Sequence, residues 1–398
     1  MSDQNILRKE TLGTALVNVV RNNMRQYTMI AALLLIWIIF SFFTKGIFLS
    51  PRNLSNLFIQ MTTIGILTCG MVLVMVAGNI DLSVGSVCGT LGALVAWLMV
   101  EKGIHPAFAI MITLAAGFAV GCWHGYWIAF RNVVPWVVTL ASFLGFRGVT
   151  LAITKGFTIA QFPAGFKIIG QEYFLHSVLE GNAFRIATSL IFAIVVIAFV
   201  VSQIFTRRKR IQNGFNVLPL PFEIAKIVII CAGIIFAGYV MSSYRGIPYA
   251  IIILLTVAVI FTIITTLTKF GRHVYAIGGN IEAARLSGVN VRKTVMGICM
   301  LMGLLSAVAA IVFTSRLNAA TSSAGSLFEL DAIAACIIGG TATSGGIGTI
   351  FGALIGALVM ASLDNGMSLM NLPIMYQYIV KGMVLLIAVW IDISNRKK

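Results

Sequence analysis

The sequence predicts an all-α membrane protein whose helices cross the bilayer about twelve times. Of the 398 residues, 59% are hydrophobic and 10% are charged, and the mean hydropathy is +0.99. A soluble domain carries about 25% charged residues. Apolar runs recur along nearly the whole chain, and each is about as long as the roughly 17–25 residues that a bilayer needs. Basic residues, finally, gather in alternate polar segments.

The expected elements follow the apolar runs in chain order. A polar segment, 1–27, precedes a full-length span, which indicates an anchor and not a cleaved signal peptide. One transmembrane domain follows at 28–392, interrupted by a long polar loop at 269–293, and a tail at 393–398 ends the chain. By hydropathy the spans are expected at 28–44, 57–77, 84–100, 105–128, 133–153, 184–205, 221–242, 248–268, 294–314, 330–345, 347–364 and 374–392.

The basic side chains orient these spans. Lys and Arg residues precede the first span, follow the sixth at 207–210, gather in the loop 269–293, and end the chain. Fewer basic residues occupy the opposite loops. Because cytoplasmic loops carry the excess of Lys and Arg, both termini are expected in the cytoplasm, which agrees with an even number of spans. The net charge of +16 is therefore ascribed to cytoplasmic loops and not to nucleic-acid binding.

Residue types that usually carry catalysis or bind metals are scattered. The six cysteines lie singly in apolar stretches, without the paired spacing of a disulfide framework or a metal site. The four histidines are dispersed as well, and a structural or interfacial role is the favoured interpretation for each. We find no nucleophile–base constellation and no GxxxxGK[ST] motif that would bind ATP. The sequence predicts neither an enzyme nor a metalloprotein.

An internal repeat relates two hairpins, 117–148 and 352–382. Each begins with a small-xxx-small helix, passes through a polar turn, and has a proline about ten residues before a glycine. The first hairpin turns in the cytoplasm at Arg131, and the second turns outside at Asp364 and Asn365. Opposite orientation predicts an inverted repeat, which is typical of transporters whose substrate path follows the repeat interface. The alternative is that two Gly-rich spans merely look alike.

Two polar interruptions fall within membrane depth, "GNIDLSVG" at 78–85 and "ELDAIAACIIGGTATSGG" at 329–346. A broken backbone is tolerated in hydrocarbon only where it is buried in protein or lines a watery cavity, so broken helices are predicted here. Ionisable residues at such places are functional candidates, with helix capping as the alternative and the favoured one for Asp81. The candidate residues of a translocation path are Asn79, Asp81, Ser83, Glu329, Asp331, Thr341 and Ser344.

A short charged helix is predicted in the cytoplasmic loop, at "GGNIEAARLSG". Asn280 suits the N-cap, Glu282 is placed favourably in the first turn, and Gly288 suits the C-cap. Such a short helix does not hold together alone in water. The small Ala283 and Ala284 on its surface suit insertion into a cleft of a partner. The alternative is a solvated turn between two spans.

"GRHVYAIGGNIEAARLSGVNVRK", "ELDAIAACIIGGTATSGGIGTIFGALIGA" and "YQYIVKG" resemble the membrane permeases of bacterial ABC importers for monosaccharides, the ribose/xylose/galactoside group. The resemblance covers almost the whole chain. "SLDNGMSLM" and the extra apolar pair around 184–242 are most similar to xylose and multiple-sugar permeases. The resemblance implies that the loop 269–293 carries a coupling helix that docks on an ATPase subunit. The docking residues that it implies are Gly279, Asn280, Glu282, Ala283, Ala284, Arg285 and Gly288.

The resemblance also implies the partners. A separate ATPase subunit binds and hydrolyses ATP, so the permease itself carries no cofactor. An extracytoplasmic sugar-binding protein delivers the monosaccharide, expected to be xylose or a related pentose or hexose, to two permease copies in the inner membrane. Sugars are neutral polyols, so a polar path that binds them weakly and carries no charged site is sufficient.

Three alternatives stay open. A permease of the same superfamily for branched-chain amino acids or nucleosides would share the architecture. A secondary sugar transporter with twelve spans would need coupling-ion carboxylates deep in the bundle, and the sequence has few. A channel is disfavoured by the capped cytoplasmic helix. The sequence leaves open which sugar is carried.

Overall fold

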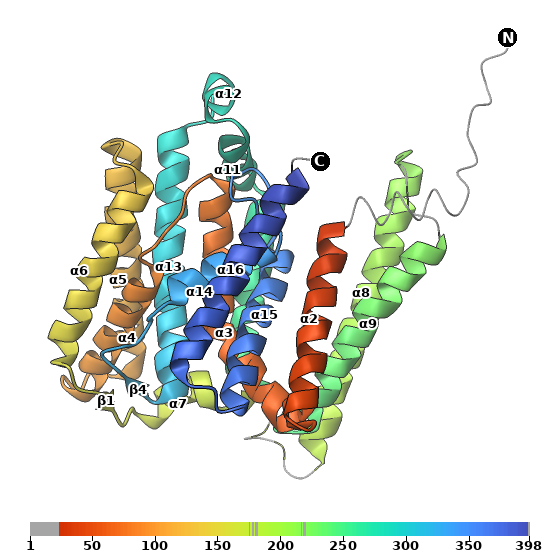
Figure 1. Cartoon of the computed structure of the whole chain (residues 1–398), viewed down its shortest axis with the longest axis horizontal. Coiled ribbons are helices and arrows are strands. Elements are labelled where there is room, and N and C mark those ends of the chain that lie inside the picture. Colours follow the sequence, from red (N-terminus) through yellow and green to blue (C-terminus); the bar gives the residue numbers. More distant parts are fainter. Residues whose placement is uncertain are drawn as a thin grey trace.

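The computed structural model of the protein describes residues 24–174, 176, 179, 182–215, 217 and 220–396. Residues 1–23 of the predicted N-terminal segment and the last two residues of the tail lie outside this part. Within it, eight helices are long and apolar enough to cross a membrane, and three further apolar helical segments are shorter. The chain runs back and forth between the two ends of one bundle (Figure 1). A polytopic all-α membrane protein is thereby confirmed.

Prolines begin several of the first helices. Pro51, Pro106 and Pro135 each occupy the first turn of a helix, where the missing N–H would have no helical partner anyway. Ser50 caps one of these helices by accepting a hydrogen bond from the amide of Asn53, at 3.4 Å. The elements of this part are α2 (Met24–Phe43), η1 (Ile47–Leu49), α3 (Pro51–Val76), α4 (Val84–Val100), α5 (Pro106–Gly125), the π-helical turn η2 (Tyr126–Phe130) and α6 (Pro135–Thr154).

Two small antiparallel ladders tie connecting segments together at one end of the bundle: β1 pairs with β4, and β2 pairs with β3. We call this the ladder end, and the opposite end, where α12 projects, the α12 end (Figure 1). The central elements are β1 (Ile159–Ala160), α7 (Ala164–Gln171), β2 (Tyr173–Phe174), α8 (Ala183–Gln212), α9 (Leu220–Ser242), β3 (Ile247–Pro248), α10 (Tyr249–Leu267), α11 (Lys269–Gly279) and α12 (Ile281–Leu286).

The last part of the chain contains the predicted break. The expected span 330–345 is wrong as a continuous helix, because α14 has 11 residues and measures about 16 Å, about half of the roughly 30 Å hydrocarbon core. The helix ends at Gly339, and Gly340 has φ +82°. The chain then runs without helix to Thr349. The elements here are α13 (Val291–Leu317), β4 (Ala319–Ala320), α14 (Phe328–Ile338), α15 (Ile350–Leu369) and α16 (Ile374–Arg396).

The core of the bundle lies around α3 and α13. Helix α3 is buried along nearly its whole length, whereas α8 and α9 pack mainly on each other and expose most of their apolar side chains, as lipid-facing helices do. Helix α13 packs on α5 at backbone contact, because a Cβ on Gly303 would overlap the carbonyl oxygen of Gly117. Small residues permit this approach where no hydrophobic force drives helices together.

Both described ends of the chain point the same way. The start of α2, the upper end of α8 and the end of α16 lie at the α12 end in Figure 1. The basic run 207–210 belongs to the last turns of α8 and therefore lies at this end as well. All the segments that the sequence assigned to the cytoplasm, as far as the structure describes them, thus share one side of the bundle.

Candidate functional site

Helix α12 projects beyond the bundle at the end of the loop after α11 (Figure 1). Asn280 caps it, because its side-chain oxygen accepts a hydrogen bond from the amide of Ala283 at 3.0 Å. Gly288 closes it at φ +85°, and its amide donates to the carbonyl of Arg285 at 3.0 Å. The N-cap prediction is confirmed, whereas the C-cap residue is Ser287 and Gly288 follows it in the left-handed conformation. Glu282 lies exposed in the first turn.

The orientation of α12 corrects one expectation. Ala284 was expected on the outer surface, but it is buried, with 5% of its surface exposed, and its helix packs on α11 and α13. Ala283 and Arg285 are exposed. Ala284 points toward the bundle because α12 packs on α11 and α13, and a small side chain fits between these helices. Ala284 therefore packs α12 against the bundle and is not available for contact with a partner.

The outer face of α12 carries a residue that the sequence reasoning missed. Leu286 has 88% of its surface exposed, and Ile281 has 50% exposed. A large apolar side chain held in water at the tip of a loop is typical of a contact surface. The signal was present in the sequence, since Ile281 and Leu286 are large apolar residues at the two ends of a short helix that also carries Glu282 and Arg285.

Helix α11 joins α12 to both breaks in the bundle. The hydroxyl of Tyr275 donates to the carbonyl of Gly348 at 2.6 Å, and the amide of Gly346 donates to the carbonyl of Val76 at 2.8 Å. A Cβ on Gly278 would overlap that same Val76 carbonyl and would lie 2.7 Å from the Gly346 nitrogen. Three backbones therefore meet at one point, which we call the triple junction: the end of α3, the end of α11, and the loop after α14.

Burial also sets the chemistry of the tyrosine at this junction. Burial raises the pKa of Tyr275 above its ordinary value, so its phenol stays protonated at neutral pH and remains a donor to Gly348. In the same loop Thr341 is fully buried, and Ser344 is exposed.

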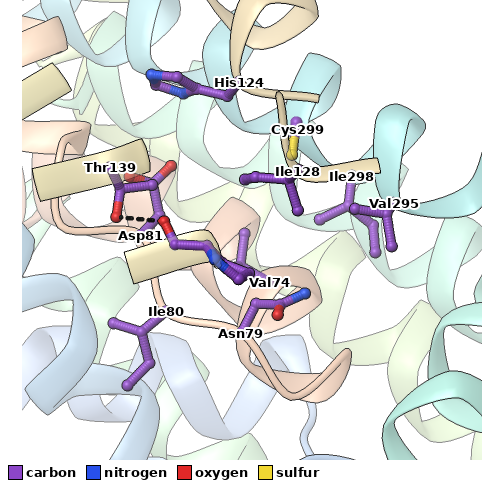
Figure 2. Close-up of a pocket in the computed structure, with 11 residues that line it drawn as sticks. Val74, Asn79, Ile80, Asp81, His124, Ile128, Thr139, Val295, Ile298 and Cys299 are labelled. Carbon is purple, nitrogen blue, oxygen red and sulfur yellow. Dashed lines mark hydrogen bonds between the residues drawn. The ribbon is translucent and has the colours of Figure 1, made fainter. Parts of the chain in front are cut away.

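The turn after α3 forms a local cap and one wall of a small cavity. Asp81 accepts hydrogen bonds from the amide and the hydroxyl of Ser83, at 2.8 and 2.6 Å, which agrees with the capping interpretation. Asn79 and Asp81 line a cavity of about 20 Å³ together with His124 of α5 and Thr139 of α6 (Figure 2). This volume is close to the roughly 10–15 Å³ that a single water needs, so a monosaccharide does not fit.

His124 has a structural partner. Its Nε2 lies 2.8 Å from the hydroxyl oxygen of Ser142, so it links α5 to α6 inside the bundle. This geometry agrees with the structural interpretation that the sequence favoured for the histidines. Groups of three or more residues that could hold a metal ion are not found in the described part of the chain.

The two acidic residues that begin α14 have different neighbours. The carboxylate of Glu329 lies against Gly85 of α4, where a Cβ would overlap it, so the two interrupted stretches touch here as well. Within the described residues, Glu329 Oε2 has no hydrogen-bond partner. Asp331 instead accepts from Lys381 of α16. Neither residue caps the helix, whose first position follows Leu327 in a left-handed conformation, at φ +65°.

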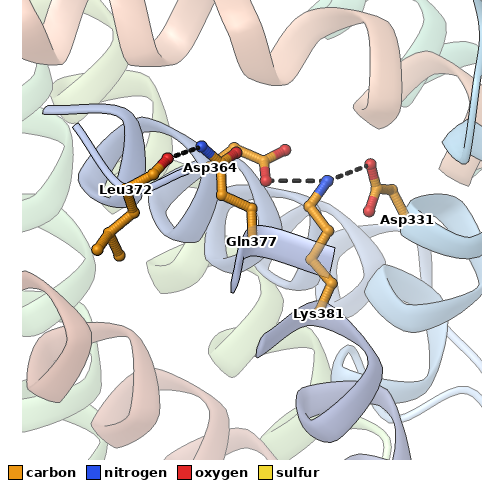
Figure 3. Close-up of polar contacts among 5 residues, drawn as sticks. All are labelled: Asp331, Asp364, Leu372, Gln377 and Lys381. Atoms are coloured by element: carbon orange, nitrogen blue, oxygen red, sulfur yellow. Dashed lines mark hydrogen bonds and ion pairs between the residues drawn. The ribbon is translucent and has the colours of Figure 1, made fainter. Parts of the chain in front are cut away.

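Lys381 holds three helices together (Figure 3). Its Nζ lies 3.0 Å from Asp331 Oδ2 of α14 and 2.9 Å from Asp364 Oδ1 of α15. Nearby, the Gln377 side chain donates to the carbonyl of Leu372 at 2.9 Å and closes the turn between α15 and α16. Lys381 lies within the apolar helix α16, about two turns after its start at Ile374, and its charge is stabilised mainly by these carboxylates.

Lys381 belongs to the motif "YQYIVKG" but was not predicted from the sequence as a site residue. The available signal was a lone basic residue inside an apolar span, in a chain with lone acidic residues in two other spans. Ionisable groups in the membrane usually pair with one another, so the pairing itself was predictable in kind. Which carboxylates pair with it depends on the packing of α14, α15 and α16.

The chain resembles known transport proteins along nearly its whole length. Residues 53–389 match the family described as branched-chain amino acid transport system / permease component. The chain is 44% identical to the xylose transport system permease protein of Haemophilus influenzae, over 94% of this chain and 98% of that protein. It is 41% identical to the protein of the same name in Escherichia coli K12, over 94% and 93% of the two chains.

A second group of relatives is named for another pentose. The chain is 34% identical to the ribose import permease protein of Bacillus subtilis strain 168, over 88% of this chain and 87% of that protein. No solved structure matches the chain.

Proposed function

Because the chain belongs to the family of transport-system permease components, we propose that it is the permease subunit of an ATP-driven importer for a monosaccharide, xylose or a related pentose or hexose. The xylose permeases match almost end to end and at higher identity than the ribose permease, which supports xylose as the first candidate. The chain is a transport subunit and not an enzyme. ATP hydrolysis belongs to a separate ATPase subunit, and a sugar-binding protein delivers the substrate.

The single observation that carries the proposal is helix α12 with its junction. The helix is capped at both ends, seated on Ala284, and presents Leu286 to the outside. This is the arrangement expected of a coupling helix that inserts into a groove of the ATPase subunit, with Glu282, Ala283 and Arg285 around the apolar contact. The α12 end is then cytoplasmic, together with both termini, in the inner membrane.

The triple junction supplies a physical route for coupling. A movement of α12 is transmitted along α11 to Gly278, whose backbone abuts both Val76 and Gly346. These residues border the two breaks that hold Asn79, Asp81, Thr341 and Ser344. Packed interiors transmit strain because they have little free volume, so closure of the ATPase subunits would shift both broken segments at once.

An inverted repeat is part of the proposal. Hairpin 117–148 turns at the α12 end and hairpin 352–382 turns at the ladder end (Figure 1). Each also contributes one basic side chain to the segment that enters α14: Arg147 donates to the Ala324 carbonyl at 2.8 Å, and Lys381 pairs with Asp331. Two copies of the permease would surround one path, with the coupling loop 269–293 of each copy docked on one ATPase subunit.

One observation favours a second candidate. The description of the matching family names branched-chain amino acids. The relatives that cover nearly the whole chain at 41–44% identity are instead named for xylose, and one at 34% identity is named for ribose. The sugar assignment is the better supported of the two.

The test is substrate uptake by proteoliposomes that contain the permease, its ATPase subunit and its binding protein. We expect accumulation of radiolabelled D-xylose that requires ATP inside and binding protein outside. Uptake of L-leucine in place of any pentose or hexose would favour the second candidate. Sugar uptake driven by a proton gradient, without the ATPase subunit, would contradict the proposal altogether.

A further inference from the structure

We propose that a cavity at the ladder end of the bundle is a binding site for a neutral, hydroxyl-rich small molecule, a monosaccharide, before it crosses the membrane. The cavity measures about 280 Å³ and lies between the first turns of α3, the α7–β2 segment, the loop that precedes β3, and the end of α13. This inference rests on the proposed function and adds to it a place where the sugar itself contacts the permease.

The groups that line the cavity suit a polyol. The polar ones are amides, phenols and guanidinium groups without a carboxylate: Asn56, Gln60, Gln171, Tyr173, Tyr244, Arg245 and Arg316. Ile59 and Gly170 complete the lining. A sugar hydroxyl both donates and accepts hydrogen bonds. Amide side chains offer one acceptor and two donors each, so they complement hydroxyls better than a set of pure donors would.

Several of these side chains are held in place before any ligand arrives. The rings of Tyr173 and Tyr244 meet edge to face at 6.0 Å, and the Arg245 guanidinium lies 5.9 and 5.5 Å from their centroids. The Gln171 amide donates to the Arg316 carbonyl at 3.1 Å. Side chains that are already ordered lose less conformational freedom on binding, which favours a small ligand with few contacts.

Gln60 of the lining is held in the same way. Its side-chain oxygen accepts from Asn365 at 3.4 Å, and Asn365 in turn accepts from Asn53 at 2.8 Å, so these bonds link α3 to α15. Burial raises the pKa of Tyr173, so its phenol is neutral at pH 7 and available as a donor.

Size and position agree with an entry site. Pockets for drug-sized ligands measure about 300–1,000 Å³, so 280 Å³ suits a smaller molecule such as a monosaccharide with a few waters. The cavity beside Asp81, nearer the α12 end, has room for about one water. Of these two cavities, the one at the ladder end has sugar-sized space, and this end faces the binding protein if the α12 end is cytoplasmic.

The competing ligand is an anion, because two arginines contribute to the walls. Arg245 stacks on two tyrosines, and Arg316 lies over Phe313 with its guanidinium carbon 5.7 Å from the ring centroid. Guanidinium groups stacked in this way still donate hydrogen bonds at their edges to hydroxyl oxygens. An anion has no hydrogen-bond donor, so it could not bind the side-chain amide oxygens of Asn56 and Gln171.

Saturation-transfer NMR on the permease–ATPase complex in nanodiscs, without binding protein, tests the site with D-xylose as the probe. We expect magnetisation transfer to the sugar protons and millimolar affinity. Arg245→Gln and Tyr244→Ala should each weaken that affinity about tenfold, as expected for one or two lost hydrogen bonds. Arg52 is an exposed arginine in the first turn of α3 and does not line the cavity. Arg52→Gln should therefore leave the affinity for D-xylose unchanged.

Three outcomes overturn the inference: no transfer to D-xylose, equal effects of Arg245→Gln and Arg52→Gln, or displacement of D-xylose by inorganic phosphate at lower concentration. Arg245 is exposed, so its variant is expected to fold, and an unchanged thermal midpoint verifies this. ATP-driven uptake by the wild-type transporter is measured in parallel. Uptake without NMR binding refutes this site alone, whereas binding without uptake refutes the proposed function.

Discussion

At the residue scale, Lys381 is the charged group on which the α14–α16 side of the bundle depends. It bridges Asp331, whose side chain is 5% exposed, and Asp364, whose side chain is 37% exposed. Removing one partner from a buried ion pair leaves an uncompensated charge, whereas removing all of them can be nearly neutral. The pairing is therefore a device that positions the short helix α14 and not a simple gain in stability.

Lys381→Met is expected to destabilise the permease by up to about 3–5 kcal/mol, because it leaves the buried Asp331 without a counter-charge. Thermal unfolding in detergent measures the change. Asp364→Asn should cost less, since this carboxylate is partly exposed and the Asp331–Lys381 pair remains. The triple variant, Lys381→Met with Asp331→Asn and Asp364→Asn, should recover most of the loss. A triple variant as unstable as Lys381→Met alone would refute this account.

Single residues were predictable where the physics is local. The N-cap role of Asn280 depends only on neighbours within three residues, and the structure has it; the end of α12 was predicted to within one residue, since Ser287 is the C-cap and Gly288 follows it. Ala284 was placed on the wrong face, because the inward side of a six-residue helix is decided by α11 and α13. Lys381 was passed over for the same reason, since its partners are distant in sequence.

At the element scale, α12 is a platform for a partner. Leu286→Asp should leave the stability of the permease unchanged, since the side chain is 88% exposed. It should weaken binding of the ATPase subunit by at least about tenfold, because burying a leucine contributes about 1.5–3 kcal/mol and 1.4 kcal/mol is a factor of ten. The affinity is measured by immobilising the permease on a surface and titrating it with the ATPase subunit.

Leu220→Asp is the matched control for that experiment. Leu220 is also an exposed leucine, at 56%, and begins α9 at the same end of the bundle. It should leave ATPase binding as in the wild type. Equal affinities for the Leu286→Asp and Leu220→Asp variants would mean that α12 is an ordinary solvated loop.

The helices with long apolar runs were predicted from the sequence, whereas the elements without such runs were missed. The predicted span 84–100 coincides with α4, because a long apolar run leaves the backbone little choice in a bilayer. Hydropathy alone placed a full span at 330–345, because it averages over the window, whereas the glycines of the same stretch predicted the break that ends α14 at Gly339. Helix α7 and the ladders, which shape the cavity at the ladder end, carry no membrane signal and were missed.

At the scale of the whole molecule, the proposal fixes which end faces the cytoplasm. In a variant without the six native cysteines, Ser287→Cys on α12 should react with a membrane-impermeant maleimide only in inside-out vesicles. Lys102→Cys, exposed in the loop between α4 and α5, should react only in intact cells with a permeable outer membrane. Labelling of both positions from the same side would contradict an orientation in which the α12 end and the ladder end face opposite sides of the membrane.

The central claim is that α11 carries movement from α12 to the two breaks through the triple junction, and the number of sugars moved per ATP hydrolysed tests it most directly. Gly278→Val places side-chain atoms against the Val76 carbonyl, an overpacking that costs about 1–3 kcal/mol, whereas Gly233→Val on α9 enters open space. In proteoliposomes with binding protein and D-xylose, the Gly278→Val transporter is predicted to hydrolyse ATP while its uptake falls at least about tenfold. The Gly233→Val transporter is predicted to keep the wild-type ratio. An unchanged ratio in Gly278→Val, with the protein folded and inserted, would show that coupling does not pass through this junction.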